Sequence, residues 1–179
     1  MPDAPGLELI AGEISSRHDG AVLETSFEHD YATVIVDSGR VLDVLRWLRG
    51  TPGQEYRFLS SLHAADYLPA EPRFAVHYDL LNMPRIERIH VKALLSDPAT
   101  DNGSNLPEID SCVSLFPTAE FHEREAYDFF GIVFRNHPDL RRILMPEDYV
   151  GWPQRRDFPI GGEPVLFTHN EIEAPRWFE

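Results

Sequence analysis

Residues 121–131, FHEREAYDFFG, gather side chains that could carry acid/base chemistry. Glu123 and Glu125 bracket Arg124, and His122 precedes them. A carboxylate and an imidazole that reach the same substrate can act as general base and general acid. The same residue types can instead form an ion-pair and hydrogen-bond network that specifies geometry, since desolvation offsets much of the attraction within a buried pair. The segment alone therefore leaves two hypotheses open, a hydrolase-like site and a structural joint.

The flanking residues predict that this segment is a helix. Thr118 is a favourable N-cap residue, and Gly131 stands where a left-handed glycine commonly ends a helix. On such a helix Arg124 and Asp128 are four residues apart, so they can form an ion pair across one turn.

The residues before this helix predict an α+β domain over residues 1–134. Two further helices are expected, one with its apolar residues from Leu7 to Ile14 at helical spacing and one over residues 39–50 capped by Ser38. Runs rich in β-forming residues cover 21–27, 31–37, 56–68, 73–83 and 85–96. The order α-β-β-α-β-β-β-α predicts a mostly antiparallel five-stranded sheet with helices packed on one face.

Residues 135–179 have a different character and are predicted to form an extended arm. Prolines at positions 138, 146, 153, 159 and 164 exclude a long helix or a central strand. The arm is nevertheless rich in apolar side chains, which need a surface to cover them. Asp139 can cap a short helix through residues 140–144, and we interpret His137, beside Pro138, as a turn or hydrogen-bonding residue.

Composition excludes several classes of function. The net charge of −14 disfavours nonspecific binding to nucleic acid or to an anionic membrane. The single cysteine, Cys112, cannot form an internal disulfide or supply four thiolates to an iron–sulfur cluster. The sequence has no HExxH zinc motif and no glycine-rich nucleotide fingerprint. No membrane span or secretory signal is evident, so we expect a soluble, cytoplasmic chain without metal or cofactor.

Residues 123–144, EREAYDFFGIVFRNHPDLRRIL, resemble the signature of the soluble C subunit of respiratory complex I, the proton-translocating NADH:quinone oxidoreductase. The matching positions are Glu123, Arg124, Glu125, Asp128, Phe129, Phe130, His137, Arg141, Ile143 and Leu144. The resemblance continues through residues 145–162, MPEDYVGWPQRRDFPIGG, which contain Gly-x-Pro, two basic residues and Asp-Phe-Pro. The chain is therefore similar to the C subunit, also called the 30 kDa subunit.

The resemblance implies a non-catalytic subunit of the hydrophilic arm of the complex. Such a subunit braces the quinone-site (D-type) subunit and the small (B-type) subunit that holds the terminal iron–sulfur cluster. FMN, iron–sulfur clusters and quinone are then expected in partner subunits only. The resemblance also implies a peripheral position on the cytoplasmic side of the bacterial inner membrane, reached only through partners.

Two alternatives stay open. Asn136, His137 and Pro138 also resemble the equivalent subunit of a ferredoxin-driven photosynthetic complex, and membrane-bound hydrogenases carry similar subunits. A free-standing hydrolase that uses Glu123 or Glu125 with His122 is the alternative from a different class.

Within the resemblance, the Glu-Arg-Glu triplet is interpreted as a joint between the domain and the arm. Arginines of the arm alternate with apolar residues, so we expect them to contact a partner through bidentate pairs. Large aromatic side chains often dominate such contacts. The expected interface residues of the arm are Arg141, Arg142, Trp152, Arg155, Arg156, Asp157 and Phe158.

Overall fold

The computed structural model describes residues 2–98 and 105–159. Residues 160–179, which include the end of the predicted arm, lie outside the described part. Along the chain, the helices and strands are α1 (Ala4–Arg17), β1 (Val22–Glu28), β2 (Tyr31–Asp37), the 3-10 turn η1 (Ser38–Arg40), α2 (Val41–Gly50), β3 (Phe58–Asp66), β4 (Phe74–Asn82), β5 (Glu87–Leu95), β6 (Glu108–Asp110), α3 (Ala119–Phe130) and β7 (Val133–Arg135).

Five strands form one sheet in the order β1-β2-β5-β4-β3. The pairs β1·β2, β5·β4 and β4·β3 are antiparallel, whereas β2 runs parallel to β5. A parallel pair needs a crossover connection, and here the chain from β2 to β5 includes α2 and two antiparallel strands. The prediction of an α+β fold with a mostly antiparallel five-stranded sheet is therefore confirmed.

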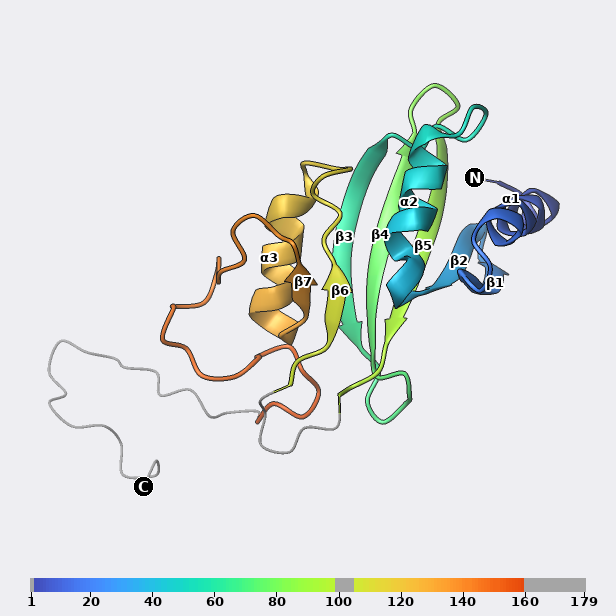
Figure 1. Ribbon diagram of the computed structural model, residues 1–179. Helices are drawn as coiled ribbons and strands as arrows, with labels where there is room; N and C mark the ends of the chain where they lie inside the picture. The colour runs from blue at the N-terminus through green and yellow to red at the C-terminus, as the bar shows by residue number, and fades with distance from the viewer. Residues whose placement is uncertain (1, 99–104, 160–179) are drawn as a thin grey trace, which may run out of the picture.

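The helices pack on one face of this sheet, as predicted. Figure 1 shows α2 lying in front of β4 and β5, α1 beside β1 and β2, and α3 next to β3. Side chains alternate between the two faces of a strand, so every second residue of a strand points to the helices. In β4 these core residues are Phe74, Val76, Tyr78 and Leu80, all inaccessible to solvent. They belong to one apolar cluster with buried residues of all three helices.

The opposite face of the sheet carries a row of three histidines. The rings of His63 and His77 stack with their centroids 4.8 Å apart, and Nδ1 of His77 lies 2.8 Å from Nε2 of His90. His90 Nδ1 lies 2.8 Å from Oδ1 of Asp79, while the Tyr67 hydroxyl lies 3.1 Å from His77 Nε2. Neutral imidazoles satisfy the chain of bonds from Tyr67 to Asp79, because each ring then donates once and accepts once. No sequence pattern predicted this row, since its residues come together only through strand register.

Two local predictions were wrong, and one short pair of strands was not predicted. Helix α2 begins at Val41 rather than after Ser38, because the Asp37 carboxylate accepts from Gly39 N–H and caps a 3-10 turn first. Asp139 caps no helix, since residues 140–144 contain only bends and irregular backbone. A short parallel pair, β6·β7, was not anticipated because each strand has only three residues.

Candidate functional site

Helix α3 and the arm meet at Gly131, where the helix ends. Gly131 has φ +69°, and its N–H donates to the Tyr127 carbonyl over 2.8 Å. A Cβ at this position would lie 2.5 Å from the ring of Trp152, so glycine is required both by the backbone and by the close approach of the arm. Trp152 also packs edge-on against Tyr127, with ring centroids 5.3 Å apart. The prediction that Gly131 ends the helix is confirmed, and Trp152 packs the arm against this glycine.

Glu123 points into the domain and is 0 % exposed. One carboxylate oxygen accepts from the Cys112 N–H over 2.7 Å. Burial raises the pKa of Glu123, while hydrogen bonds from Ser111 and Cys112 oppose that rise. Its other oxygen has no hydrogen-bond partner among the described residues and lies 4.0 Å from Nε2 of His137. A substrate could not reach this carboxylate, so Glu123 does not suit the hydrolase hypothesis.

His137 lies at the start of the arm and joins it to α3. Its Nε2 lies 3.0 Å from the Glu120 carbonyl, and its Nδ1 lies 3.0 Å from the Asp139 N–H. The first contact requires a protonated Nε2, and the second requires a bare Nδ1 that accepts. These partners assign a neutral imidazole, which acts as a bridge between helix and arm.

Arg124 contacts the arm instead of Asp128. Its Nε and Nη2 donate to the carbonyls of Arg141 and Arg142, both over 3.2 Å. The predicted pair between Arg124 and Asp128 is therefore wrong. Asp128 lies on the buried side of α3, where a different set of donors surrounds it.

Asp128 is the centre of the joint. It is 0 % exposed, and its Oδ2 accepts from the backbone N–H groups of Ile143, Leu144 and Met145 over 3.0, 2.7 and 2.9 Å. Its Oδ1 accepts from Nη1 of Arg142 over 2.8 Å. Burial alone would raise the pKa of Asp128, but these backbone donors and the Arg142 guanidinium hold it below its ordinary value. A single ionised carboxylate thus anchors three consecutive residues of the arm.

Arg142 completes this anchor from the arm side. Its Nη2 donates to the carbonyls of Tyr149 and Gly151, over 3.1 and 2.9 Å, and its guanidinium lies 4.5 Å from the centroid of Trp152. The planar guanidinium group of Arg142 therefore binds α3 and also holds residues 149 and 151 of the arm close to residue 142. Arg141, by contrast, is exposed, and its side chain pairs with Asp139 over 2.9 Å.

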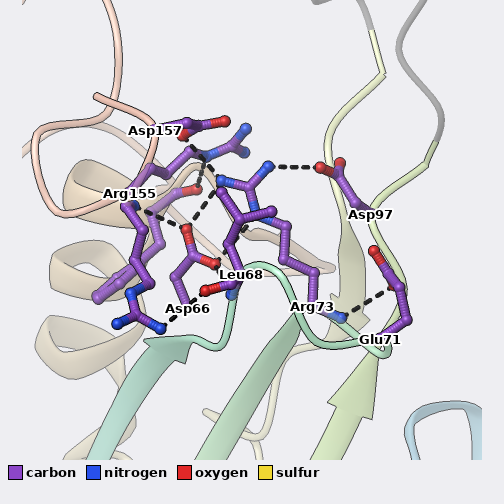
Figure 2. A network of polar contacts seen from close by, with 9 residues as sticks. Asp66, Leu68, Glu71, Arg73, Asp97, Arg155 and Asp157 are labelled. Atoms are coloured by element: carbon purple, nitrogen blue, oxygen red, sulfur yellow. Dashed lines mark hydrogen bonds and ion pairs between the residues drawn. The ribbon is translucent and has the colours of Figure 1, made fainter. Parts of the chain in front are cut away.

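Residues 156 and 157 of the arm are held by a second cluster at the β3–β4 hairpin, shown in Figure 2. Arg73, which is 4 % exposed, pairs with Asp66 over 2.8 Å, Asp97 over 2.7 Å and Asp157 over 2.8 Å. Although burial opposes it, the bonds to Arg73 hold the pKa of Asp66 at about 2. Arg156 donates its backbone N–H to Asp66 over 2.9 Å. Asp157 and Arg156 of the arm are thereby fixed to a site that no sequence motif marked.

The remaining predicted residues of the arm also contact the chain itself. Arg155 donates its Nε to the Phe130 carbonyl over 2.7 Å, and its guanidinium lies 5.0 Å from the Phe74 ring centroid. Phe158 packs against Gly151 and Tyr149. Asp66, Arg73 and Asp97 were missed because their spacing is irregular and only the hairpin brings them together. The contact of Arg155, Trp152 and Phe158 with another subunit stays a prediction.

Glu125 is the one member of the triplet that points away from the joint. Together with His122 it lines a cleft of about 270 Å³ between β3 and α3. Within residues 2–98 and 105–159, no group of three or more His, Cys, Asp or Glu side chains is arranged to hold a metal ion. In the same part of the chain, no helix has the length and apolar character needed to cross a membrane.

Comparison with known proteins identifies the family of this chain. A family model described as "Respiratory-chain NADH dehydrogenase, 30 Kd subunit" matches residues 34–164, which include α3 and both arm anchors. Proteins named as the C subunit of NADH-quinone oxidoreductase are similar along most of the chain. The relative from Roseiflexus castenholzii is 44 % identical over 162 residues, which are 90 % of this chain and 89 % of the relative. The relative from Citrifermentans bemidjiense is 41 % identical, over 84 % of this chain and 88 % of its own.

The fold also has a counterpart among solved structures. A chain in the structure of the membrane-bound sulfane sulfur reductase, an archaeal respiratory membrane complex, matches with a TM-score of 0.68 and 20 % identity, covering 94 % of this chain and 97 % of that chain. The fold is thus shared well beyond the relatives from NADH-quinone oxidoreductases. Since the family model covers the sheet, α3 and the anchored arm, and the relatives agree over most of their length, the chain belongs to the family of the 30 kDa subunit, or C subunit, of respiratory-chain NADH dehydrogenase.

Proposed function

We propose that this chain is a non-catalytic scaffold subunit of a proton-translocating NADH:quinone oxidoreductase. The observation that carries the proposal is the way in which five polar side chains within residues 123–144 are used. Glu123, Arg124, Asp128, His137 and Arg142 are all engaged in hydrogen bonds that join α3 to its surroundings or to the arm. Side chains committed to such bonds are not available for a substrate, whereas they hold the arm in one conformation for docking.

This proposal assigns a role to each part of the chain and to its partner subunits. Residues 1–134 form the domain, and residues 135–179 form an arm that binds partners. The partners are the quinone-site (D-type) and terminal-cluster (B-type) subunits, which carry quinone and iron–sulfur chemistry, while FMN lies in another subunit. The assembled complex is a translocase with NADH:quinone oxidoreductase activity. This chain lies on the cytoplasmic side of the inner membrane and reaches the membrane only through partners.

The test is purification of the tagged full-length chain from membranes of its host, with mass identification of the proteins that come with it. We expect the quinone-site and terminal-cluster subunits to co-purify, and the complex to reduce quinone with NADH. The isolated chain should show no turnover with NADH and quinone. Turnover by the isolated chain, or its isolation without any partner, would contradict the proposal.

A second candidate is the same scaffold role in a complex with another electron donor. It is favoured by one observation, the shared fold with a chain of the sulfane sulfur reductase complex. The same purification separates the two candidates. NADH-binding flavoprotein subunits in the preparation support the first, and their absence from an otherwise complete complex supports the second.

A further inference from the structure

The cleft between β3 and α3 is built from three parts of the chain. Ser61 and His63 line it from β3, Glu125 and Phe129 from α3, and Gln154 from the arm. Gln154 is held in place by its backbone N–H, which donates to the Phe129 carbonyl over 3.1 Å. The cleft is therefore complete only when the arm is seated on α3.

Two polar side chains of the cleft, Glu125 and His122, have atoms without a partner among the described residues. The Glu125 carboxylate is exposed and forms no hydrogen bond or ion pair with any described residue. His122 Nδ1 is shielded from solvent and has no hydrogen-bond partner in the described part of the chain. An ionised carboxylate can only accept hydrogen bonds, whereas an imidazole nitrogen accepts or donates according to its tautomer. Glu125 thus gives the cleft one negative charge that no described residue neutralises.

Two aromatic residues, Phe129 and Phe130, also line the cleft. The nearby arginines of the joint do not neutralise Glu125, since Arg124, Arg142 and Arg155 donate to carbonyls or to Asp128. An apolar or anionic side chain would leave the Glu125 charge desolvated without compensation.

We propose that this cleft receives an arginine or lysine side chain from a neighbouring subunit of the complex, with Glu125 as its counter-ion. The inference rests on the proposed function, because it needs a partner subunit. Glu123 and Arg124 are used within the chain, so the third member of the triplet is the one that points outward. The net charge of −14 makes a basic partner surface the complementary one.

The test compares Glu125→Gln with Glu120→Gln in the full-length chain within the assembled complex. Both variants remove one negative charge from α3, but Glu120 does not line the cleft. We expect Glu125→Gln to lower retention of the chain in the complex at least about threefold at low ionic strength, and the difference from wild type to shrink in high salt. Equal retention of both variants would overturn the inference.

A second measurement identifies the occupant. A photo-crosslinking amino acid at Gln154 leaves Glu125 intact and should react with a peptide of another subunit that contains Arg or Lys. Cross-links only within this chain, or none, would overturn the proposal. The isolated Glu125→Gln chain should unfold at the wild-type urea concentration, since the Glu125 carboxylate has no partner among the described residues. Glu120→Gln should unfold at a slightly lower urea concentration, since it removes a negative charge from the first turn of α3. If the wild-type chain joins no complex, the proposed function itself fails, and the two failures are thereby distinguished.

Discussion

At the scale of single residues, Asp128 carries the joint. Its carboxylate is fully buried, yet it stays ionised because three backbone N–H groups and Arg142 surround it. A buried charge is stable only while its partners remain in place. Because the buried Asp128 carboxylate needs these donors to stay ionised, residues 143–145 are held in one conformation.

Asp128→Asn should destabilise the folded chain by about 3–5 kcal/mol, because the amide cannot replace a charge that satisfies four donors. Urea unfolding at pH 7 measures this loss. Asp139→Asn, which affects the exposed pair with Arg141, should change stability by less than about 1 kcal/mol. Equal effects of the two substitutions would show that Asp128 has no special role.

The histidine row gives a second prediction at this scale. Burial, together with electrostatic repulsion from His90, His63 and Lys92 when His77 is protonated, lowers the pKa of His77 from 6.5 to about 3. The unfolded chain then binds a proton more readily than the folded chain. The stability that depends on neutral His77 is complete above pH 6.5 and is lost as the pH falls toward 3, by up to about 1.4 kcal/mol per pH unit.

His77→Gln should reduce this dependence on pH. The variant is expected to be less stable at pH 7.5, because the bonds to Tyr67 and His90 are altered, but its stability should fall less steeply between pH 6.5 and 4.5. Urea unfolding at several pH values measures both slopes. The control variant His29→Asn changes a residue at an exposed turn, and its stability should change with pH as that of wild type does. If the stability of His77→Gln falls with pH as steeply as that of wild type, the pH dependence does not come from His77.

At the scale of elements, residues 135–159 of the arm are packed as part of the fold. They are fixed near α3 by Asp128 and Arg142 and near the β3–β4 hairpin by Arg73 and Asp66. Between these anchors the backbone of the arm forms turns, since the spaced prolines prevent a regular element. A prearranged arm loses less conformational entropy when it docks on a partner.

Arg142→Ala should release the arm from α3 without unfolding the sheet. The backbone N–H groups of residues 143–145 are expected to exchange with deuterium at least about tenfold faster, since their bonds to Asp128 depend on the paired guanidinium. Hydrogen exchange with mass analysis of arm peptides measures this change. Arg141→Ala, which removes an exposed pair, is the matched control and should exchange like wild type. Unchanged protection in Arg142→Ala would refute the role of this anchor.

The sequence was informative where a local rule applies and uninformative where distant residues meet. Helix α3, its terminal Gly131 and the five strands could be predicted from spacing and composition. The partner of Asp128 could not, because an i,i+4 rule favours Arg124 while burial and three converging N–H groups select Arg142. The Arg73 cluster and the histidine row likewise depend on strand register and on a hairpin, which leave no periodic pattern in the chain.

At the scale of the whole molecule, the three residues of the Glu-Arg-Glu triplet make three different kinds of contact. Glu123 bonds within the domain, Arg124 binds the arm, and Glu125 lines an open cleft. Of the three, Glu125 is the one whose side chain has no bonded partner among the described residues. The described part of the molecule is thus a sheet domain with residues 135–159 packed on α3 and a cleft between α3 and β3.

The most direct test of the scaffold account is the amount and the turnover of complex assembled with Arg142→Ala, compared with Arg141→Ala, after purification from host membranes. The account predicts less assembled complex for Arg142→Ala, with normal NADH:quinone turnover for each complex that does assemble. Arg141→Ala should give wild-type amounts if its exposed pair contributes little to the joint. A normal amount of Arg142→Ala complex that has lost quinone reduction would contradict the account.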